Sequence, residues 1–226
     1  EADEGSSNVV FKKCYAKGYH CGFQSKGHAT TKPAESITFD NCTAEACAYG
    51  GMASVGHNPT GKSGYSPQSV VFRDFIVKNP TGNTHLQDPV ALLIYGADGV
   101  VIDGITVDGS ANIVIEQGAG KAKLENIVFK SKLANSYQGA IEIRNTANAG
   151  SVISVNNLVV STAQEIPAIF KDSAAARLVV DTAYIPNASG NEATAIKMKR
   201  QARDRIVGVW TGCKCTIDLM DEAAAK

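Results

Sequence analysis

The sequence predicts an all-β fold: a right-handed, single-stranded parallel β-helix, or solenoid, of about seven to eight rungs. Two observations lead to this prediction. A phrase made of an apolar strand, a polar pair and a second apolar strand recurs along the 226 residues. Each later copy is followed by another short apolar strand, several of which alternate apolar with polar residues, as strands do. A recurring unit that cannot bury its apolar face alone indicates a stacked solenoid.

The copies of the phrase share an apolar anchor directly before the polar pair. The anchors are Phe11, Phe39, Phe72, Ile102, Leu124, Val155 and Val180, and a degenerate last copy is expected at 206–210. The spacing between anchors varies, and the variation falls between strands, where loops can lengthen without disturbing the core. We therefore expect one coil of the solenoid for each copy.

The strands that follow the phrase complete each coil. They are expected at 91–94, 112–115, 140–143, 168–170 and 195–198. Together with the phrase they give three short strands per repeat. Each rung should pair in parallel with the next one, about 4.8 Å away.

The second member of the polar pair is expected to turn the chain sharply between two strands. This position holds Lys13, Asn41, Asp74, Gly104, Asn126, Asn157 and Thr182 along the stack. A sharp turn needs a left-handed backbone, which Asn, Asp and Gly adopt at the lowest cost. Stacked Asn side chains can also hydrogen-bond from rung to rung.

With these turn residues, residues 8–219 resemble the pectate-lyase-like superfamily of right-handed parallel β-helices, whose hallmark is an asparagine ladder. The superfamily includes polysaccharide lyases, glycoside hydrolases and phage tailspikes. The resemblance implies a polysaccharide ligand and an extracellular or virion-surface location. The polygalacturonase motifs are missing, and so is the Asp-Pro-His motif of alginate epimerases, because Asp88 and Pro89 are followed by Val90. Lyases and tailspikes, whose motifs are less uniform, remain open.

Composition limits the partners. Lys plus Arg number 22 and Asp plus Glu number 22, so the formal net charge is zero. A neutral balance gives no general attraction to nucleic acid or to an anionic membrane, and no apolar stretch is long enough to span a bilayer. We expect one β-helix domain over residues 1–226, with the solenoid at 8–219 and a tail at 220–226, or a fragment of a longer protein.

One column of side chains carries most of the candidate chemistry. The strands that follow the phrase can be aligned by their first residue, which is Ala or Asn. This alignment places Tyr95, Glu116, Arg144, Asp172 and Lys199 at one equivalent position. From Glu116 onward, acid and base alternate. One interpretation is a mutually neutralising surface ladder, in which each exposed pair contributes about 0.2–1 kcal/mol.

The other interpretation is a saccharide groove in which Glu116, Arg144, Asp172 and Lys199 are catalytic and Tyr95 binds substrate. Polysaccharide lyases need a base and a cation that stabilises the enolate-like charge. Glycoside hydrolases need two carboxyl groups flanking the bond. Glu116 and Asp172 should lie about 9.6 Å apart by rung spacing, which overlaps the inverting range.

Further substrate-binding candidates lie beside this column and in the longest loops. Glu142 offers another carboxylate, and His20 leads directly into a strand. The loop at 50–67 contains His57 and Tyr65, and the loop at 79–89 contains His85 and Asp88. Binding residues tend to collect in such loops.

The cysteines favour a structural role. Cys14 and Cys42 occupy the same place in successive copies and should point inward and stack, while Cys21 and Cys47 should open the following strands. They are interpreted as small buried apolar groups, or as a disulfide between neighbouring rungs. Cys213 and Cys215 share one strand face near the end. No His accompanies them at zinc spacing, so we expect no metal and no cofactor.

The sequence thus predicts a carbohydrate-active β-helix protein that binds and cleaves a long polysaccharide, as a lyase or a hydrolase. The alternatives are a non-enzymatic tailspike or adhesin rod, expected to be a homotrimer, and a structural β-helix fragment.

Overall fold

The fold is built from parallel strands in two sheets. The computed structural model describes residues 1–3, 5–27, 33–55, 67–82, 88–116, 119–144, 150–161, 166–185, 195–211 and 217–220. Within these ranges the chain forms strands and no helix, and every strand pairing is parallel. The prediction of an all-β chain with parallel strands is confirmed, and the arrangement is consistent with a β-solenoid.

One sheet has ten strands and the other has eight. The ten-stranded sheet contains β1 (Ser7–Lys12), β2 (Tyr15–Lys17), β4 (Glu35–Asp40), β5 (Thr43–Glu45), β7 (Val71–Lys78), β9 (Val100–Asp108), β11 (Lys121–Phe129), β13 (Val152–Val160), β15 (Arg177–Ile185) and β17 (Arg205–Thr211). The eight-stranded sheet contains β3 (Cys21–Gly27), β6 (Tyr49–Val55), β8 (Val90–Tyr95), β10 (Asn112–Glu116), β12 (Ile141–Ile143), β14 (Ile169–Lys171), β16 (Ile196–Met198) and β18 (Ile217–Leu219).

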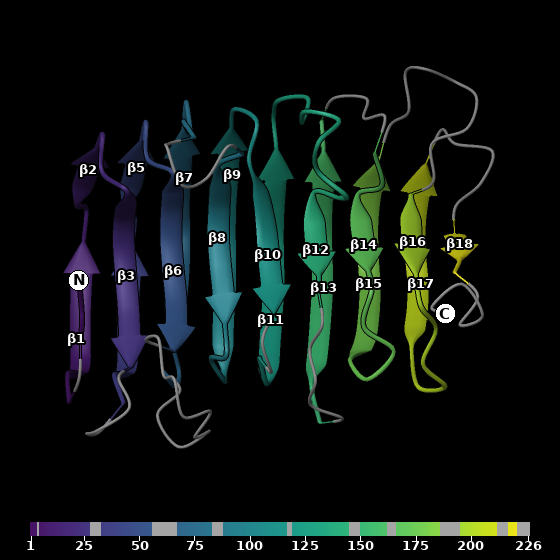
Figure 1. The fold of residues 1–226 in the computed structure, drawn as a ribbon, viewed down its shortest axis with the longest axis horizontal. Coiled ribbons are helices and arrows are strands. Elements are labelled where there is room, and N and C mark those ends of the chain that lie inside the picture. Colours follow the sequence, from purple (N-terminus) through teal and green to yellow (C-terminus); the bar gives the residue numbers. More distant parts are fainter. Residues whose placement is uncertain are drawn as a thin grey trace.

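The chain visits the two sheets alternately, and each visit adds a strand beside the previous one (Figure 1). Three strands per repeat, as expected, occur in the first two repeats, where β1, β2 and β3 are followed by β4, β5 and β6. From β7 onward the two strands around the turn form one continuous strand, so each later repeat has two.

The predicted anchors stack in register through the ten-stranded sheet. Successive pairs are Phe11 with Phe39, Phe39 with Phe72, Phe72 with Ile102, Ile102 with Leu124, Leu124 with Val155, Val155 with Val180, and Val180 with Ile206. The ring centroid of Phe39 lies 5.2 Å from that of Phe11 and 5.1 Å from that of Phe72. The anchor prediction is therefore confirmed, including the last copy at 206.

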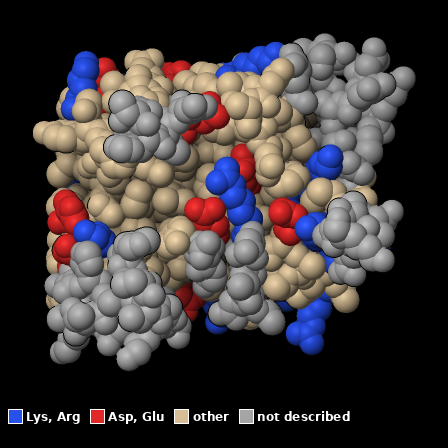
Figure 2. Space-filling model, in the orientation of Figure 1, with Lys and Arg blue, Asp and Glu red and all other residues tan. Residues whose placement is uncertain are grey.

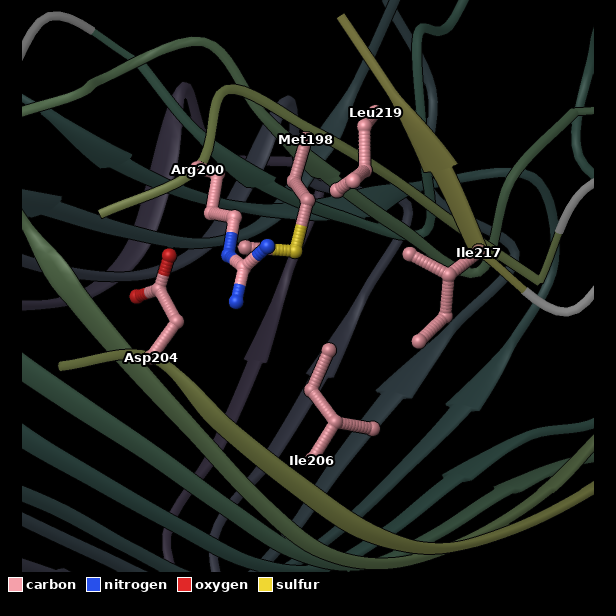
Figure 3. A pocket seen from close by; sticks show the side chains of 6 residues that line it. All are labelled: Met198, Arg200, Asp204, Ile206, Ile217 and Leu219. Atoms are coloured by element: carbon pink, nitrogen blue, oxygen red, sulfur yellow. The ribbon is translucent and has the colours of Figure 1, made fainter. Parts of the chain in front are cut away.

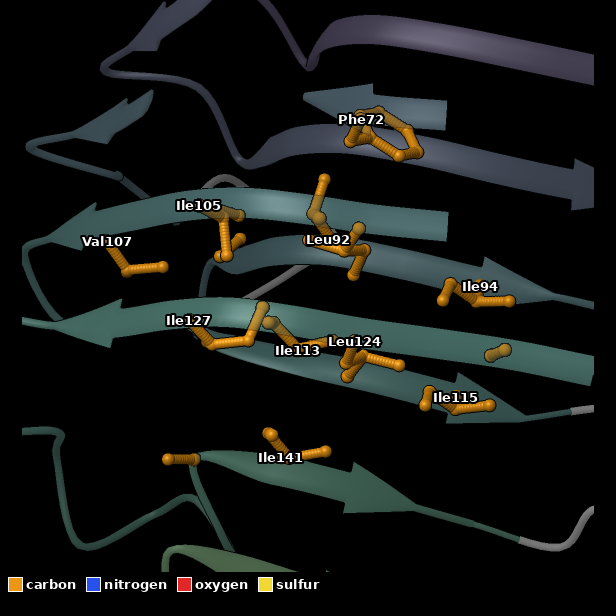
Figure 4. Packing of buried hydrophobic residues seen from close by; sticks show 14 of the residues in the cluster. Phe72, Leu92, Ile94, Ile105, Val107, Ile113, Ile115, Leu124, Ile127 and Ile141 are labelled. Atoms are coloured by element: carbon orange, nitrogen blue, oxygen red, sulfur yellow. The ribbon is translucent and has the colours of Figure 1, made fainter. Parts of the chain in front are cut away.

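The core lies between the two sheets, where apolar side chains from both meet (Figure 4). Phe72 and Leu124 come from the ten-stranded sheet and Leu92 from the eight-stranded sheet, and all three are fully buried. Gly51 makes room for Leu92 and Phe72. A Cβ atom at this position would lie 2.5 Å from Leu92 and 2.7 Å from Phe72, so no larger residue fits without a shift of the core.

Six of the seven predicted turn residues have the expected left-handed backbone. Their φ angles are 53° for Lys13, 52° for Asn41, 47° for Asp74, 89° for Gly104, 57° for Asn126 and 54° for Asn157. Thr182 differs: it has no positive φ angle, and it pairs with Gly208 of β17. Its β-branched side chain disfavours a left-handed backbone, which explains the difference.

Side-chain hydrogen bonds join neighbouring turns in the middle of the stack. Asn157 donates from Nδ2 to Oδ1 of Asn126 at 2.8 Å, and Asn126 donates to Oδ1 of Asp103 at 3.2 Å. Thr182 ends the row by accepting the backbone N–H of Asn157 at 2.8 Å. The expected hydrogen bonding between stacked Asn side chains is confirmed for Asn126 and Asn157.

One buried polar group was not expected. Lys171 lies in the inward column between Ile143 and Met198 and is fully buried. Its Nζ donates to the carbonyl of Lys199 at 2.7 Å and pairs with Asp204 at 3.1 Å. Burial lowers the pKa of Lys171, and the charge of Asp204 opposes this shift.

The hydrogen bonds between neighbouring turn residues lead to a test at Asn157. Asn157→Ala should lower the free energy of unfolding by about 2 kcal/mol, because it removes a hydrogen bond and leaves a Cβ-bearing residue without a polar side chain in a left-handed conformation. Asn157→Gly removes the same hydrogen bond but relieves the backbone, so we expect a smaller loss of about 1 kcal/mol. Urea unfolding measures both. Equal losses would show that the left-handed backbone contributes nothing.

Candidate functional site

The five side chains expected in one column do lie in one line on the eight-stranded sheet. Glu116 pairs directly with Tyr95. The pairings of Ile115 with Ile143, Ile143 with Lys171, and Lys171 with Met198 place the residues that follow these strands in the same line. This charged column consists of Tyr95, Glu116, Arg144, Asp172 and Lys199. It lies at the carboxyl ends of the strands, and Figure 2 shows acidic and basic side chains alternating across the middle of this face.

The charges of the column form two ion pairs. Arg144 Nη1 lies 3.7 Å from Glu116 Oε2, and Lys199 Nζ lies 2.5 Å from Asp172 Oδ1. The side chains of Arg144 and Asp172 remain 45% and 48% exposed. Because water screens such pairs, each contributes at most about 1 kcal/mol, so a ligand can compete for them at small cost.

Arg144 is oriented by a second carboxylate. Glu142 Oε2 accepts hydrogen bonds from Arg144 Nε at 2.7 Å and lies 2.6 Å from Nη2. The other oxygen of Glu142 accepts from Asn112 Nδ2 at 2.7 Å and from the backbone N–H groups of Gln138 and Gly139 at 2.9 and 3.3 Å. This two-point contact holds the guanidinium in a defined direction.

Glu142 was expected to bind substrate, and the structure shows its carboxylate buried beside Arg144. Its side chain is 0% exposed, because the segment between β11 and β12 folds back over the outer face of the eight-stranded sheet. Leu133 and Tyr137 of that segment are buried, and the Tyr137 hydroxyl donates to the carbonyl of Pro89 at 2.7 Å. The Glu142 carboxylate therefore holds this segment and Arg144 and is not open to a ligand.

Asp88 and His20 lie away from the column. Asp88 precedes β8 whereas Tyr95 ends it, a separation of about 23 Å along an extended strand. His20 precedes β3 in the same way, and its ring packs edge-on against Tyr49 with centroids 5.3 Å apart. The expected residues His57, Tyr65 and His85 lie outside the described part of the chain.

Sequence reasoning missed two tyrosines whose pKa is raised, Tyr137 and Tyr49. Asp88 contributes to raising the pKa of the Tyr137 hydroxyl, after burial, which is the larger cause. Burial raises the pKa of Tyr49, and the charge of Glu116 adds to this shift. Neither tyrosine belongs to the aligned column, so the strand alignment gave no signal for them.

Alternating charges also occur on the ten-stranded sheet. Ion pairs join Lys12 to Asp40 at 3.3 Å and Arg73 to Asp103 at 3.7 Å. In-register stacking places like positions one above another, so opposite charges in neighbouring copies pair readily. Alternation alone therefore does not mark a binding site. Arg144 differs from Arg73 because a buried carboxylate orients it.

The cysteines confirm one expectation and correct another. Tyr15 pairs with Thr43, and Thr43 pairs with Ile76, so Cys14, Cys42 and Phe75 occupy one line as expected. Cys42 is fully buried and Cys14 partly buried.

Cys21 and Cys47 do not occupy equivalent places, because Cys21 pairs with Tyr49. Within the described residues Cys14, Cys21, Cys42 and Cys47 are free thiols. Cys213 and Cys215 lie outside the described residues.

The described residues contain no group of three or more His, Cys, Asp or Glu side chains placed to hold a metal ion. A cavity of about 310 Å³ lies at the last strands. It is lined by Met198, Arg200, Asp204, Ile206, Ile217 and Leu219 (Figure 3). Asp204 is already engaged by Lys171, and apolar side chains form much of the remaining wall.

No family model matches the chain, and comparisons with curated proteins and with solved structures also found no match. Among the described residues there is no helix long and apolar enough to cross a membrane.

The burial of Glu142 leads to a second prediction. Glu142→Gln should lower the free energy of unfolding by about 2 kcal/mol, since an amide nitrogen would face donors that now reach a buried carboxylate. Glu116→Gln is the matched control, because Glu116 is partly exposed and makes one long ion pair; its effect should stay within about 0.5 kcal/mol. Thermal or urea unfolding checks both. Similar losses for the two variants would contradict the assigned role of Glu142.

Cys21 leads to a prediction about pH. Burial is the main cause that raises the pKa of the Cys21 thiol from 9.0 to about 12. The folded state therefore keeps its proton at pH values where the unfolded chain has lost it. The stabilisation is fully present below about pH 8.5 and is lost as the pH rises toward 12. Urea midpoints between about pH 8 and 10.5 should fall less steeply for Cys21→Ala than for the unchanged protein. Parallel slopes would contradict the raised pKa.

Proposed function

We propose that this chain is a carbohydrate-active β-helix protein that binds a long acidic polysaccharide along the charged column and cleaves it. The observation that carries the proposal is the placement of two cations, the exposed Arg144 and the partly exposed Lys199, in one in-register line with polar neighbours. Successive members of the line recur about every 4.8 Å, which is comparable with the length of one sugar unit in an extended polysaccharide. A uronate polymer could thus place carboxylates beside both cations.

The finer description of the fold belongs to the same proposal. We place the chain in the pectate-lyase-like superfamily, as a right-handed coil of about seven to eight rungs. The left-handed turn residues, the Asn126–Asn157 hydrogen bond and the parallel stacking of the anchors support this placement.

The arrangement of the charged column favours an elimination reaction, as in a lyase, over hydrolysis of the glycosidic bond. In a lyase reaction a base removes the proton beside the uronate carboxylate, a C=C bond forms, and the glycosidic C–O bond breaks as the leaving oxygen takes a proton. Arg144 and Lys199 would stabilise the negative charge that develops on the carboxylate, and Glu116 or Asp172 would accept the proton. An inverting hydrolase needs room for a water molecule between its two carboxyl groups, but Arg144 occupies the position between Glu116 and Asp172. A retaining hydrolase needs carboxyl groups about 5–5.5 Å apart, closer than two residues that are two strands apart.

A non-enzymatic binding rod, such as a trimeric tailspike or adhesin at a virion or cell surface, is the second candidate. The observation that favours it is that each acid of the column has a basic neighbour within 4.0 Å. Each carboxylate would have to leave its cation before it could accept a proton from a substrate.

The test is binding and cleavage of a panel of uronate polymers such as polygalacturonate and alginate. Arg144→Ala and Lys199→Ala should each weaken retention of the binding polymer about ten- to a hundredfold, the loss expected for a hydrogen bond between charged groups. Product formation, followed by the near-ultraviolet absorbance of the new C=C bond, should fall with them.

Arg73→Ala is the matched control, because Arg73 has similar exposure and also pairs with an acid, but lies on the ten-stranded sheet. It should leave binding unchanged. Retention without absorbing products would support the binding rod instead. If no polymer binds, or if Arg73→Ala weakens binding as much as Arg144→Ala does, the charged column is not the site.

A further inference from the structure

Two thiols of the first two repeats lie in adjoining strands at the same register position. Cys14 directly precedes β2 and Cys42 directly precedes β5, which pair in parallel from Tyr15 and Thr43 onward. The N–H of Thr43 donates to the carbonyl of Cys14 at 2.9 Å. Neighbouring strands are about 4.8 Å apart, and disulfides join Cα atoms about 4.4–6.8 Å apart.

The two side chains lie on the same side of the paired strands, because in-register positions of parallel strands face the same way. Burial raises the pKa of the Cys42 thiol, and the charge of Cys14 adds to this shift, as expected for neighbouring thiols. The Cys42 thiol additionally lies 3.4 Å from the carbonyl of Phe11 in the neighbouring strand. Cys42 is fully buried, whereas Cys14 is partly exposed. A reagent in solution can therefore reach Cys14 first, with Cys42 placed behind it as the resolving thiol.

We propose that Cys14 and Cys42 form a redox-responsive pair that closes into a disulfide between the first two repeats of the solenoid. The oxidant is a small-molecule disulfide such as oxidised glutathione. The Cys14 thiolate attacks one sulfur of the oxidant, which forms a mixed disulfide and releases one glutathione thiolate. The Cys42 thiolate then attacks Cys14 Sγ and displaces the second glutathione. The two cysteine protons end on the two released thiols, so two cysteines are oxidised as one disulfide is reduced.

The position of the pair gives the bridge a structural effect. Within the described residues, β1 and β2 lie at the end of the ten-stranded sheet and have a strand neighbour on one side only. Such end strands open more easily than central ones. A covalent link from the start of β2 to the start of β5 restricts this opening because it closes the intervening chain into a loop.

Cys21 and Cys47 provide an internal comparison. They lie close enough for the charge of Cys47 to raise the pKa of Cys21. However, Cys21 is in register with Tyr49, and the Cys47 thiol donates to the carbonyl of Glu45 at 3.4 Å. Proximity without matching register should not yield a disulfide, since the bond requires both the distance and the direction of the Cβ atoms.

The experiment uses the full chain in buffers with different ratios of oxidised to reduced glutathione. Free thiols are then alkylated, and the linked peptides are identified by mass spectrometry. We expect a Cys14–Cys42 link that excess reduced glutathione reverses, while Cys21 and Cys47 remain alkylated. Amide hydrogen exchange in β1 and β2 should slow on the order of ten- to a hundredfold on oxidation, with no change in β13.

Two variants sharpen the test. Cys42→Ser should abolish the link and the slower exchange, whereas Cys47→Ser should leave both intact. The proposal is overturned if oxidation leaves both thiols free, if Cys14 accumulates as a stable glutathione adduct, or if Cys21 and Cys47 link instead. The peptide map of the unchanged protein decides between these outcomes even if a variant does not fold.

Discussion

Parallel pairing between successive copies is the constraint on which the rest of the structure depends. A short strand such as β12 or β14 cannot satisfy its backbone groups alone, and it does so through the strands before and after it in the stack. Parallel pairing in register forces equal positions of each copy to lie above one another. The anchor column from Phe11 to Ile206 is the direct result, and it gives the stacked strands one continuous apolar core.

The same constraint orders the surface. Any polar position that recurs in the repeat becomes a row, which explains why charges alternate on both sheets. The charged column differs from the row of Arg73 and Asp103 because a buried carboxylate lies next to it. Glu142 lies under a segment that folds back over the sheet, and it fixes one side of the Arg144 guanidinium while leaving the other side exposed. A cation that is oriented before it meets a ligand loses less conformational entropy on binding.

The interior is not uniformly apolar. Lys171 occupies an inward position in β14, where the strand alternation would place an apolar residue, and its ammonium group is paired with Asp204. Asp204 in turn accepts the backbone N–H groups of Leu178 and Gln201, both at 2.6 Å. A buried pair adds little net stability, but removing one partner leaves an uncompensated charge. The pair links the eight-stranded sheet to the start of β15 across the core.

The sequence by itself determined the stacking order of the strands and six of the seven turn residues, because these follow from a local pattern repeated at every copy. Residues such as Asn126 and Asn157 could be assigned from one repeat and checked against the next, and the charged column followed from the same alignment. The tertiary structure alone decided that Glu142 is buried, that Lys171 has a partner, and that Cys47 is out of register with Cys21. These outcomes depend on how non-repeating segments fold back or change length between strands. A repeat pattern carries no information about such segments, since their contacts join residues that are distant in sequence and occur only once.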